Sequence, residues 1–83
     1  MTKKAYIRSQ RLRPIGKEGI EQCRRILLKE GAAKINEVFV DSFSASVILA
    51  IYDKLSGKNK AKLESMPVAR ACDICYTLYG KHA

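Results

Sequence analysis

From residue 17 onward, apolar and polar positions recur with the 3.6-residue period of amphipathic helices. Over residues 17–30 an apolar stripe faces a charged side, and Lys29 in the last turn suits the negative end of the helix dipole. Gly31 provides a stop for this helix. The pattern therefore predicts a first helix over 17–30, with a buried stripe of Ile20, Cys23, Ile26 and Leu27.

The segment 42–55 is apolar around more than half of its circumference. Asp41 together with Ser42 predicts an N-cap for a second helix here. A helix that is apolar almost all round is either the central rod of a bundle or an interface. Because so short a chain has few segments to cover it, we expect a face for a partner protein or a second copy of the chain. That face consists of Ile48, Leu49 and Tyr52.

Two further helices are predicted beyond residue 56. Gly57 is placed to stop the second helix, and a short helix follows over 59–65. Pro67 suits the first position of a last helix over 67–79, which Gly80 closes. The buried face of this last helix is predicted to be Val68, Cys72, Cys75 and Tyr79.

Residues 32–40 fit two patterns. Ile35, Val38 and Phe39 match a helix, whereas Val38 and Val40 around polar Glu37 match a short extended stretch. We favour a turn followed by an extended segment, because Asp41 is then free to cap the next helix.

The first sixteen residues show no helical period, and Pro14 disfavours a helical backbone at Arg13. We therefore expect an extended arm over 1–16 in front of a single helical domain over 17–83. The predicted fold is all-α: a small bundle of three main helices and one short helix, with an extended basic N-terminal arm.

Net charge separates the same two parts of the chain. The protein has 83 residues and a formal net charge of +8; six of its sixteen basic residues lie in the first seventeen positions, where no acidic residue occurs. From Glu18 onward, ten basic residues stand against eight acidic ones. The positive charge therefore belongs to the arm, and such an arm is typical of proteins that bind a polyanion.

Lysine and arginine neutralise phosphates and release counterions, and the planar arginine fork can clasp a phosphate or enter a minor groove. A solvated, solubilising tail is the alternative, but the apolar residues interleaved with the arginines disfavour it. We therefore expect the arm to bind nucleic acid or a nucleoprotein. A second cluster in the turn before the short helix, with Lys54 and Lys62 at its ends, can extend this surface. The expected contacts are Lys3, Lys4, Arg8, Arg11, Arg13 and Lys17, with Lys58 and Lys60 from the second cluster.

No constellation of residues predicts catalysis, so we expect a protein that is not an enzyme. Cys72 and Cys75 form a C-x-x-C, but a zinc site needs two more ligands and only Cys23 and His82 are available. A redox pair belongs at a helix start, whereas this one falls inside a helix. We interpret the cysteines as small core hydrophobes and expect neither a metal nor another cofactor.

Size and composition predict one cytoplasmic domain with no membrane partner. The longest apolar run, residues 47–52, is far too short to cross a bilayer. Three cysteines without a repeating framework, and no apolar leader, favour a reducing compartment.

The sequence VDSFSAS at 40–46, with AIYDKL at 50–55, Asn59 and MPV at 66–68, resembles a pattern in small uncharacterised bacteriophage proteins. The resemblance covers the last half of the chain. It implies a phage accessory protein that acts stoichiometrically on host machinery or on defence systems, as anti-CRISPR proteins do. The alternative function is accordingly the inhibition of a host or defence protein through the apolar face of the second predicted helix.

Overall fold

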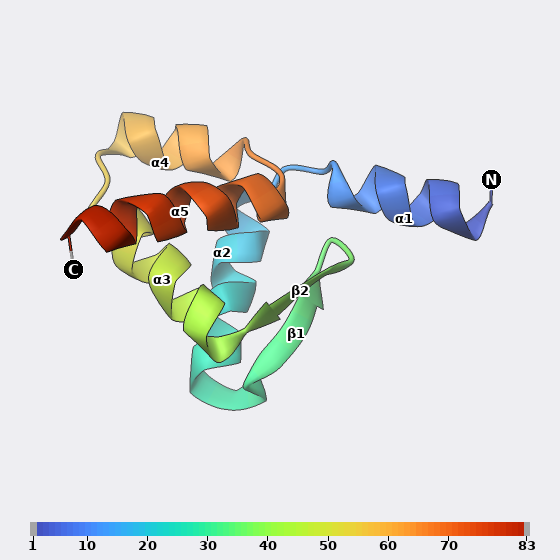
Figure 1. Ribbon diagram of the computed structural model, residues 1–83, viewed down its shortest axis with the longest axis horizontal. Coiled ribbons are helices and arrows are strands. Elements are labelled where there is room, and N and C mark those ends of the chain that lie inside the picture. Colours follow the sequence, from blue (N-terminus) through green and yellow to red (C-terminus); the bar gives the residue numbers. More distant parts are fainter. Residues whose placement is uncertain (1, 83) are drawn as a thin grey trace.

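Helix α3 lies at the centre of the fold, and α2, α5 and the hairpin pack against it (Figure 1). The computed structural model describes residues 2–82. Its elements, in chain order, are α1 (Lys3–Arg11), α2 (Gly16–Arg25), a π-helical continuation η1 (Ile26–Glu30), β1 (Ala32–Ile35), β2 (Val38–Asp41), α3 (Ser42–Tyr52), α4 (Gly57–Glu64) and α5 (Val68–His82).

The composition of α3 explains its central position. Asp41 caps the helix as predicted, because its carboxylate accepts a 2.8 Å hydrogen bond from the backbone N–H of Ser44. The exposed strip of α3 is narrow and includes Ser42 and Asp53 near its two ends. The helix is therefore the central rod of the fold, and its buried residues are Ala45, Val47, Ile48, Leu49 and Ile51.

The first predicted helix corresponds to α2 and η1 together. It ends at Gly31 as expected: Gly31 adopts a φ of 74°, and its N–H donates to the carbonyl of Ile26 at 2.8 Å. This is a bond from residue i to i+5, so the last turn is wider than an α-turn. Ile26 is buried as predicted, whereas Leu27 is 43% exposed, because the wider turn shifts the residues that follow Ile26 away from the α-helical stripe.

The fold is mostly helical, as predicted, but it is not a bundle of helices alone, because residues 32–41 form an antiparallel hairpin. Alternate residues point to the core, as in any half-buried strand pair. The two-residue turn consists of Asn36 (φ 50°) and Glu37 (φ 63°), and two positive φ angles are typical of a tight hairpin turn. The extended backbone expected before Asp41 is present, but it pairs with a second strand. The core-facing side chains are Ala33, Ile35, Val38 and Val40.

The prediction of an extended N-terminal arm is also wrong, because residues 3–11 form helix α1. Thr2 caps it: its hydroxyl accepts from the N–H of Ala5 at 3.1 Å. The lysine, alanine, glutamine and arginine residues that follow have high intrinsic helix propensity. Pro14 restricts only its immediate neighbourhood, so α1 ends at Arg11, before the proline. Helix α1 buries no residue and projects away from the other elements (Figure 1).

The last two helices differ from the prediction at their ends. Ser56 caps α4 by accepting from the N–H of Asn59 at 3.4 Å, so Gly57 begins this helix and does not stop the previous one. Helix α5 begins at Val68, one residue after the predicted start at Pro67, and continues through Gly80 to His82. Val68, Ala71 and Cys75 provide its buried face, whereas Tyr79 is 41% exposed.

Candidate functional site

Three cations lie on one face of α1. Lys4, Arg8 and Arg11 follow the spacing i, i+4 and i+7, which places them side by side along a helix. With Ile7 and Leu12 they line a shallow depression of about 320 Å³. We call Lys4, Arg8 and Arg11 the α1 basic face. The spacing was visible in the sequence, but it places the three side chains on one face only if the segment is helical.

No carboxylate neutralises this face within residues 2–82. The ion pairs there join Arg24 to Glu21 and Asp53, Arg25 to Glu30, and Lys34 to Glu37. Among the cations of residues 3–17, Arg11 donates its Nε–H to the backbone carbonyl of Glu37 at 3.2 Å. Arg13 donates to the side-chain oxygen of Gln10 at 3.0 Å. Within residues 2–82, the positive charges of residues 3–17 therefore have no carboxylate partner.

Arg13 and Lys17 line a different depression, of about 620 Å³, where the α1–α2 link meets the hairpin tip and α4. Glu18 and Glu64 also line it, so its charge is mixed. These two predicted contacts are thus near α1 in sequence but belong to a surface with both signs of charge.

The structure does not bring the predicted α4 lysines to the α1 basic face. Along the 41 Å long axis, the start of α4 and the free end of α1 lie at opposite ends of the molecule (Figure 1). Lys60 lies with its Nζ 5.2 Å from the centre of the Tyr52 ring, a cation–π contact inside the chain. Lys58 is exposed on α4. The expectation that Lys58 and Lys60 extend the arm's surface is therefore corrected, because the fold separates the two clusters.

The predicted protein-binding face is corrected as well. Ile48 and Leu49 are buried against the chain's own elements, so they offer no surface to a partner. Tyr52 is half-buried, and its hydroxyl donates to the Glu64 carboxylate at 2.6 Å. This hydrogen bond raises the pKa of Tyr52. The physical reason is that α2, η1, α5 and the hairpin suffice to cover α3.

Other apolar side chains take the exposed positions. Leu28 on η1 is 79% exposed, Phe39 on β2 is 66% exposed and Phe43 at the start of α3 is 59% exposed. The Phe43 ring lies 5.9 Å from that of Tyr76 on α5. Helical periodicity placed Phe43 in the buried sweep of α3, and no sequence signal marked Phe39 or Leu28 as surface residues.

An apolar groove of about 330 Å³ lies between the end of α3, α4 and α5. Asn59 and Lys62 are the polar residues in its lining. Sequence reasoning missed this groove, because its lining comes from three segments far apart in the chain. Its apolar residues are Ile51, Leu55, Leu63, Met66, Ile74 and Leu78.

The cysteines lie in the interior. Burial raises the pKa of the Cys23 thiol to about 12 and that of Cys75 to about 11. Cys72 is half-buried, and its pKa is also raised, chiefly by burial. The thiols are therefore protonated at neutral pH, and Cys23 and Cys75 pack as small hydrophobes, as interpreted from the sequence.

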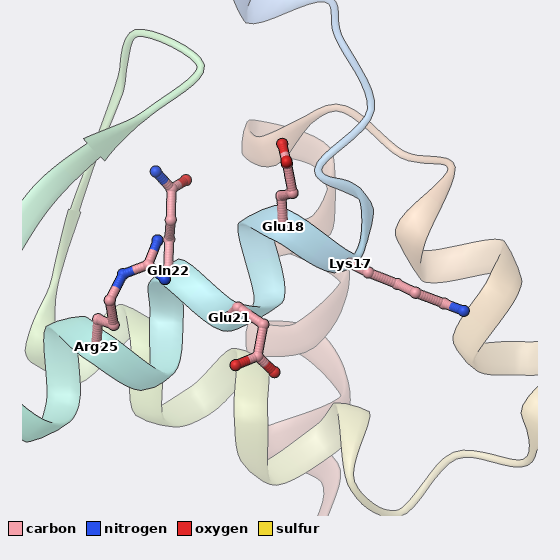
Figure 2. Close-up of a pocket in the computed structure, with 5 residues that line it drawn as sticks. All are labelled: Lys17, Glu18, Glu21, Gln22 and Arg25. Carbon is pink, nitrogen blue, oxygen red and sulfur yellow. The ribbon is translucent and has the colours of Figure 1, made fainter.

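The exposed side of α2 carries a further depression of about 480 Å³ (Figure 2). Its lining residues come from this one helix, and Figure 2 shows that they diverge. Glu18 and Glu21 extend to opposite sides, and Lys17 points away from Gln22 and Arg25. Divergent carboxylates cannot act together on one reacting bond, so we interpret this surface as a solvated helix face.

Among the described side chains, those of residues 2–81, no group of three or more Cys, Asp or Glu is arranged to hold a metal ion. In the same range, no helix combines the length and the apolar character needed to cross a membrane.

Comparison of the chain with protein-family models, with curated proteins and with solved structures gives no match. The resemblance of residues 40–68 to small bacteriophage proteins therefore stays a prediction.

Proposed function

We propose that this protein is a non-catalytic binding protein that docks onto nucleic acid, or onto a nucleoprotein, through α1. The observation that carries the proposal is the α1 basic face: three cations on one side of a helix that buries no residue and pairs with no carboxylate of residues 2–82. The resemblance of residues 40–68 to small bacteriophage proteins adds the expectation that a phage or another mobile element encodes this protein.

The chemistry of this face fits phosphate. Like charges at i and i+4 repel one another in an isolated helix, so a polyanion would stabilise α1 while releasing its own counterions. An α-helix with its side chains is about 10–12 Å across and the major groove of B-DNA is about 12 Å wide, so a helix that projects from the body, as α1 does, has dimensions that fit it. Arg8 and Arg11 bring planar forks that suit phosphate oxygens.

Fluorescence anisotropy with a labelled DNA duplex, repeated across a salt series, tests the proposal. The test variant is Lys4→Ala/Arg8→Ala/Arg11→Ala. The matched control is Lys54→Ala/Lys58→Ala/Lys62→Ala, which removes the same charge from α4 and the turn before it.

We expect the wild-type affinity to fall steeply with salt, and the α1 variant to lose about 0.9 from the logarithmic salt slope for each phosphate contact removed. The control should keep most of the slope. If both variants lost the same amount of salt slope, binding would depend on net charge and not on the α1 basic face, which would contradict the proposal. No binding by the wild type would refute it as well.

The apolar groove supports a second candidate function, the binding and inhibition of a host or defence protein. Ile51 and Leu55 of the predicted second helix line this groove, although Ile48 and Leu49 do not. Such a groove suits the apolar side chains of a partner helix. A photo-cross-linking residue at Lys62, on the groove, and another at Lys4, on α1, separate the candidates. Nuclease-resistant protein adducts at Lys62 alone would favour protein binding, and nuclease-sensitive adducts at Lys4 would favour docking on nucleic acid.

A further inference from the structure

The tip of the hairpin holds the segment that joins α1 to the body. The side-chain amide of Asn36 donates to the carbonyl of Pro14 at 3.1 Å, with a longer approach of 3.5 Å to that of Arg13. The backbone carbonyl of Glu37 accepts from the Nε–H of Arg11 at 3.2 Å. Both turn residues thus face the end of α1 and the link that follows it.

A second set of contacts holds the link from the other side. The N–H of Ile15 donates to the carbonyl of Met66 at 2.7 Å, and Pro14 forms an isolated bridge with Pro67. Residues 11–15 are therefore fixed between the hairpin tip and the start of α5. Because α1 buries no residue, these contacts set the direction in which it leaves the body.

The backbone of the tip is unusual for its sequence. Two-residue hairpin turns with both φ angles positive favour glycine in the second position, and here that position is Glu37 with a φ of 63°. Such a conformation is unfavourable for a residue with a β-carbon, and it persists where the surroundings hold it. In this turn, the carbonyl of Glu37 accepts from Arg11 at the end of α1, and the side-chain amide of Asn36 donates to Pro14 in the link between α1 and α2.

We propose that Asn36 is a positioning residue, which holds α1 at a fixed angle so that its basic face is presented in advance to a polyanion. This inference rests on the proposed function. Arg11 connects the two features, because its Nε–H bonds to the tip while its terminal NH₂ groups make no hydrogen bond within residues 2–82. Pre-orientation lowers the ordering cost of binding without adding a phosphate contact.

Asn36→Gly tests this inference, because glycine accepts the positive φ angle but lacks the amide. Phe39→Ala, a charge-neutral change at an exposed strand position of the same hairpin, outside the turn, is the matched control. Trypsin cleavage after Arg11 reports how firmly the link is held. Duplex affinity and its salt slope report binding, and thermal unfolding shows whether the body is intact.

We expect Asn36→Gly to accelerate cleavage after Arg11 and to weaken duplex binding about threefold to tenfold, with the salt slope unchanged. Phe39→Ala should not accelerate cleavage. An unchanged cleavage rate and affinity in Asn36→Gly would overturn the positioning role and leave the proposed function standing. A wild type that binds no duplex would overturn the proposed function, and with it the purpose assigned to Asn36.

Discussion

Helices α1 and α3 are similar in length, nine and eleven residues, but they form for different reasons. Helix α1 buries no residue and is stabilised by local terms: the Thr2 cap and residues of high helix propensity. Helix α3 buries five residues and is stabilised by packing against α2, η1, α5 and the hairpin. An isolated helix as short as α1 is marginal in water, so a bound partner would stabilise α1 far more than α3.

This difference assigns the two helices separate roles. The interior around α3 provides the stability of the fold. Helix α1 adds little to that stability, and its residues are free to be selected for charge. Substitutions in α1 should therefore change binding without unfolding the protein, whereas substitutions in α3 should do the reverse.

The largest expected effect is a difference in the free energy of unfolding between Ile48→Ala and Ile7→Ala. Ile48 is fully buried, so its truncation should lower the free energy of unfolding by about 2–5 kcal/mol. Ile7 is half-buried on α1, and its truncation should cost within about 0.5 kcal/mol. Urea denaturation measures both values. Similar losses for the two variants would show that α1 is part of the cooperative core.

An alkaline titration tests the buried interior alone. Burial raises the pKa of Cys23 to about 12 and that of Cys75 to about 11, from an ordinary value of 9.0. As the pH rises through 9.0, the unfolded chain releases these protons and the folded chain keeps them, so stability is complete below that pH and falls above it. The slope is about 1.4 kcal/mol per pH unit for each thiol until the folded pKa is reached.

The measurement is the free energy of unfolding under reducing conditions, at pH values on either side of 9.0. In the control Cys23→Ala/Cys75→Ala this fall should be flatter, although the variant is less stable throughout. A fall of equal slope in the control would assign the loss to other groups.

The smallest expected effect comes from a substitution in α1 that strengthens the helix while it removes positive charge. Lys4→Glu replaces the repulsive i, i+4 pair of Lys4 and Arg8 by an attractive one, with the acidic residue in the first turn. We expect α1 to be stabilised by about 0.5–1 kcal/mol, seen as larger Cα secondary shifts in NMR, while duplex affinity falls.

Lys62→Glu makes the same charge change on α4 and should leave the NMR shifts of α1 unchanged. If Lys4→Glu bound the duplex more tightly, helix content and not charge would be the limiting factor in docking.

The elements that the sequence predicted correctly are those with a strong local signal. The stripe from Ile20 to Ile26 and the stop at Gly31 located α2 and η1, and Asp41 marked the start of α3. Helix α1 was missed because a helix that buries nothing has no apolar stripe to detect. The hairpin was half predicted, since strands of four residues are too short for their alternation to exclude a helix.

The candidate site divides in the same way. The excess of positive charge over residues 3–17 was evident from the chain, and no carboxylate within residues 2–82 pairs with it. The grouping of Lys4, Arg8 and Arg11 on one face needed the helix, and the separation of Lys58 from them needed the whole fold. Whether Ile48 and Leu49 meet a partner or the core depended on which other segments cover α3.

The sequence by itself determined where the charge lies, where helices α2 and α3 begin, and which residues seek an apolar environment, because these follow from neighbouring residues. The tertiary structure alone decided that the chain's own elements cover α3, that the hairpin tip contacts the link between α1 and α2, and that the start of α4 lies far from the free end of α1. These three features depend on contacts between segments that are distant in the chain, and local sequence patterns do not determine which of those segments pack together.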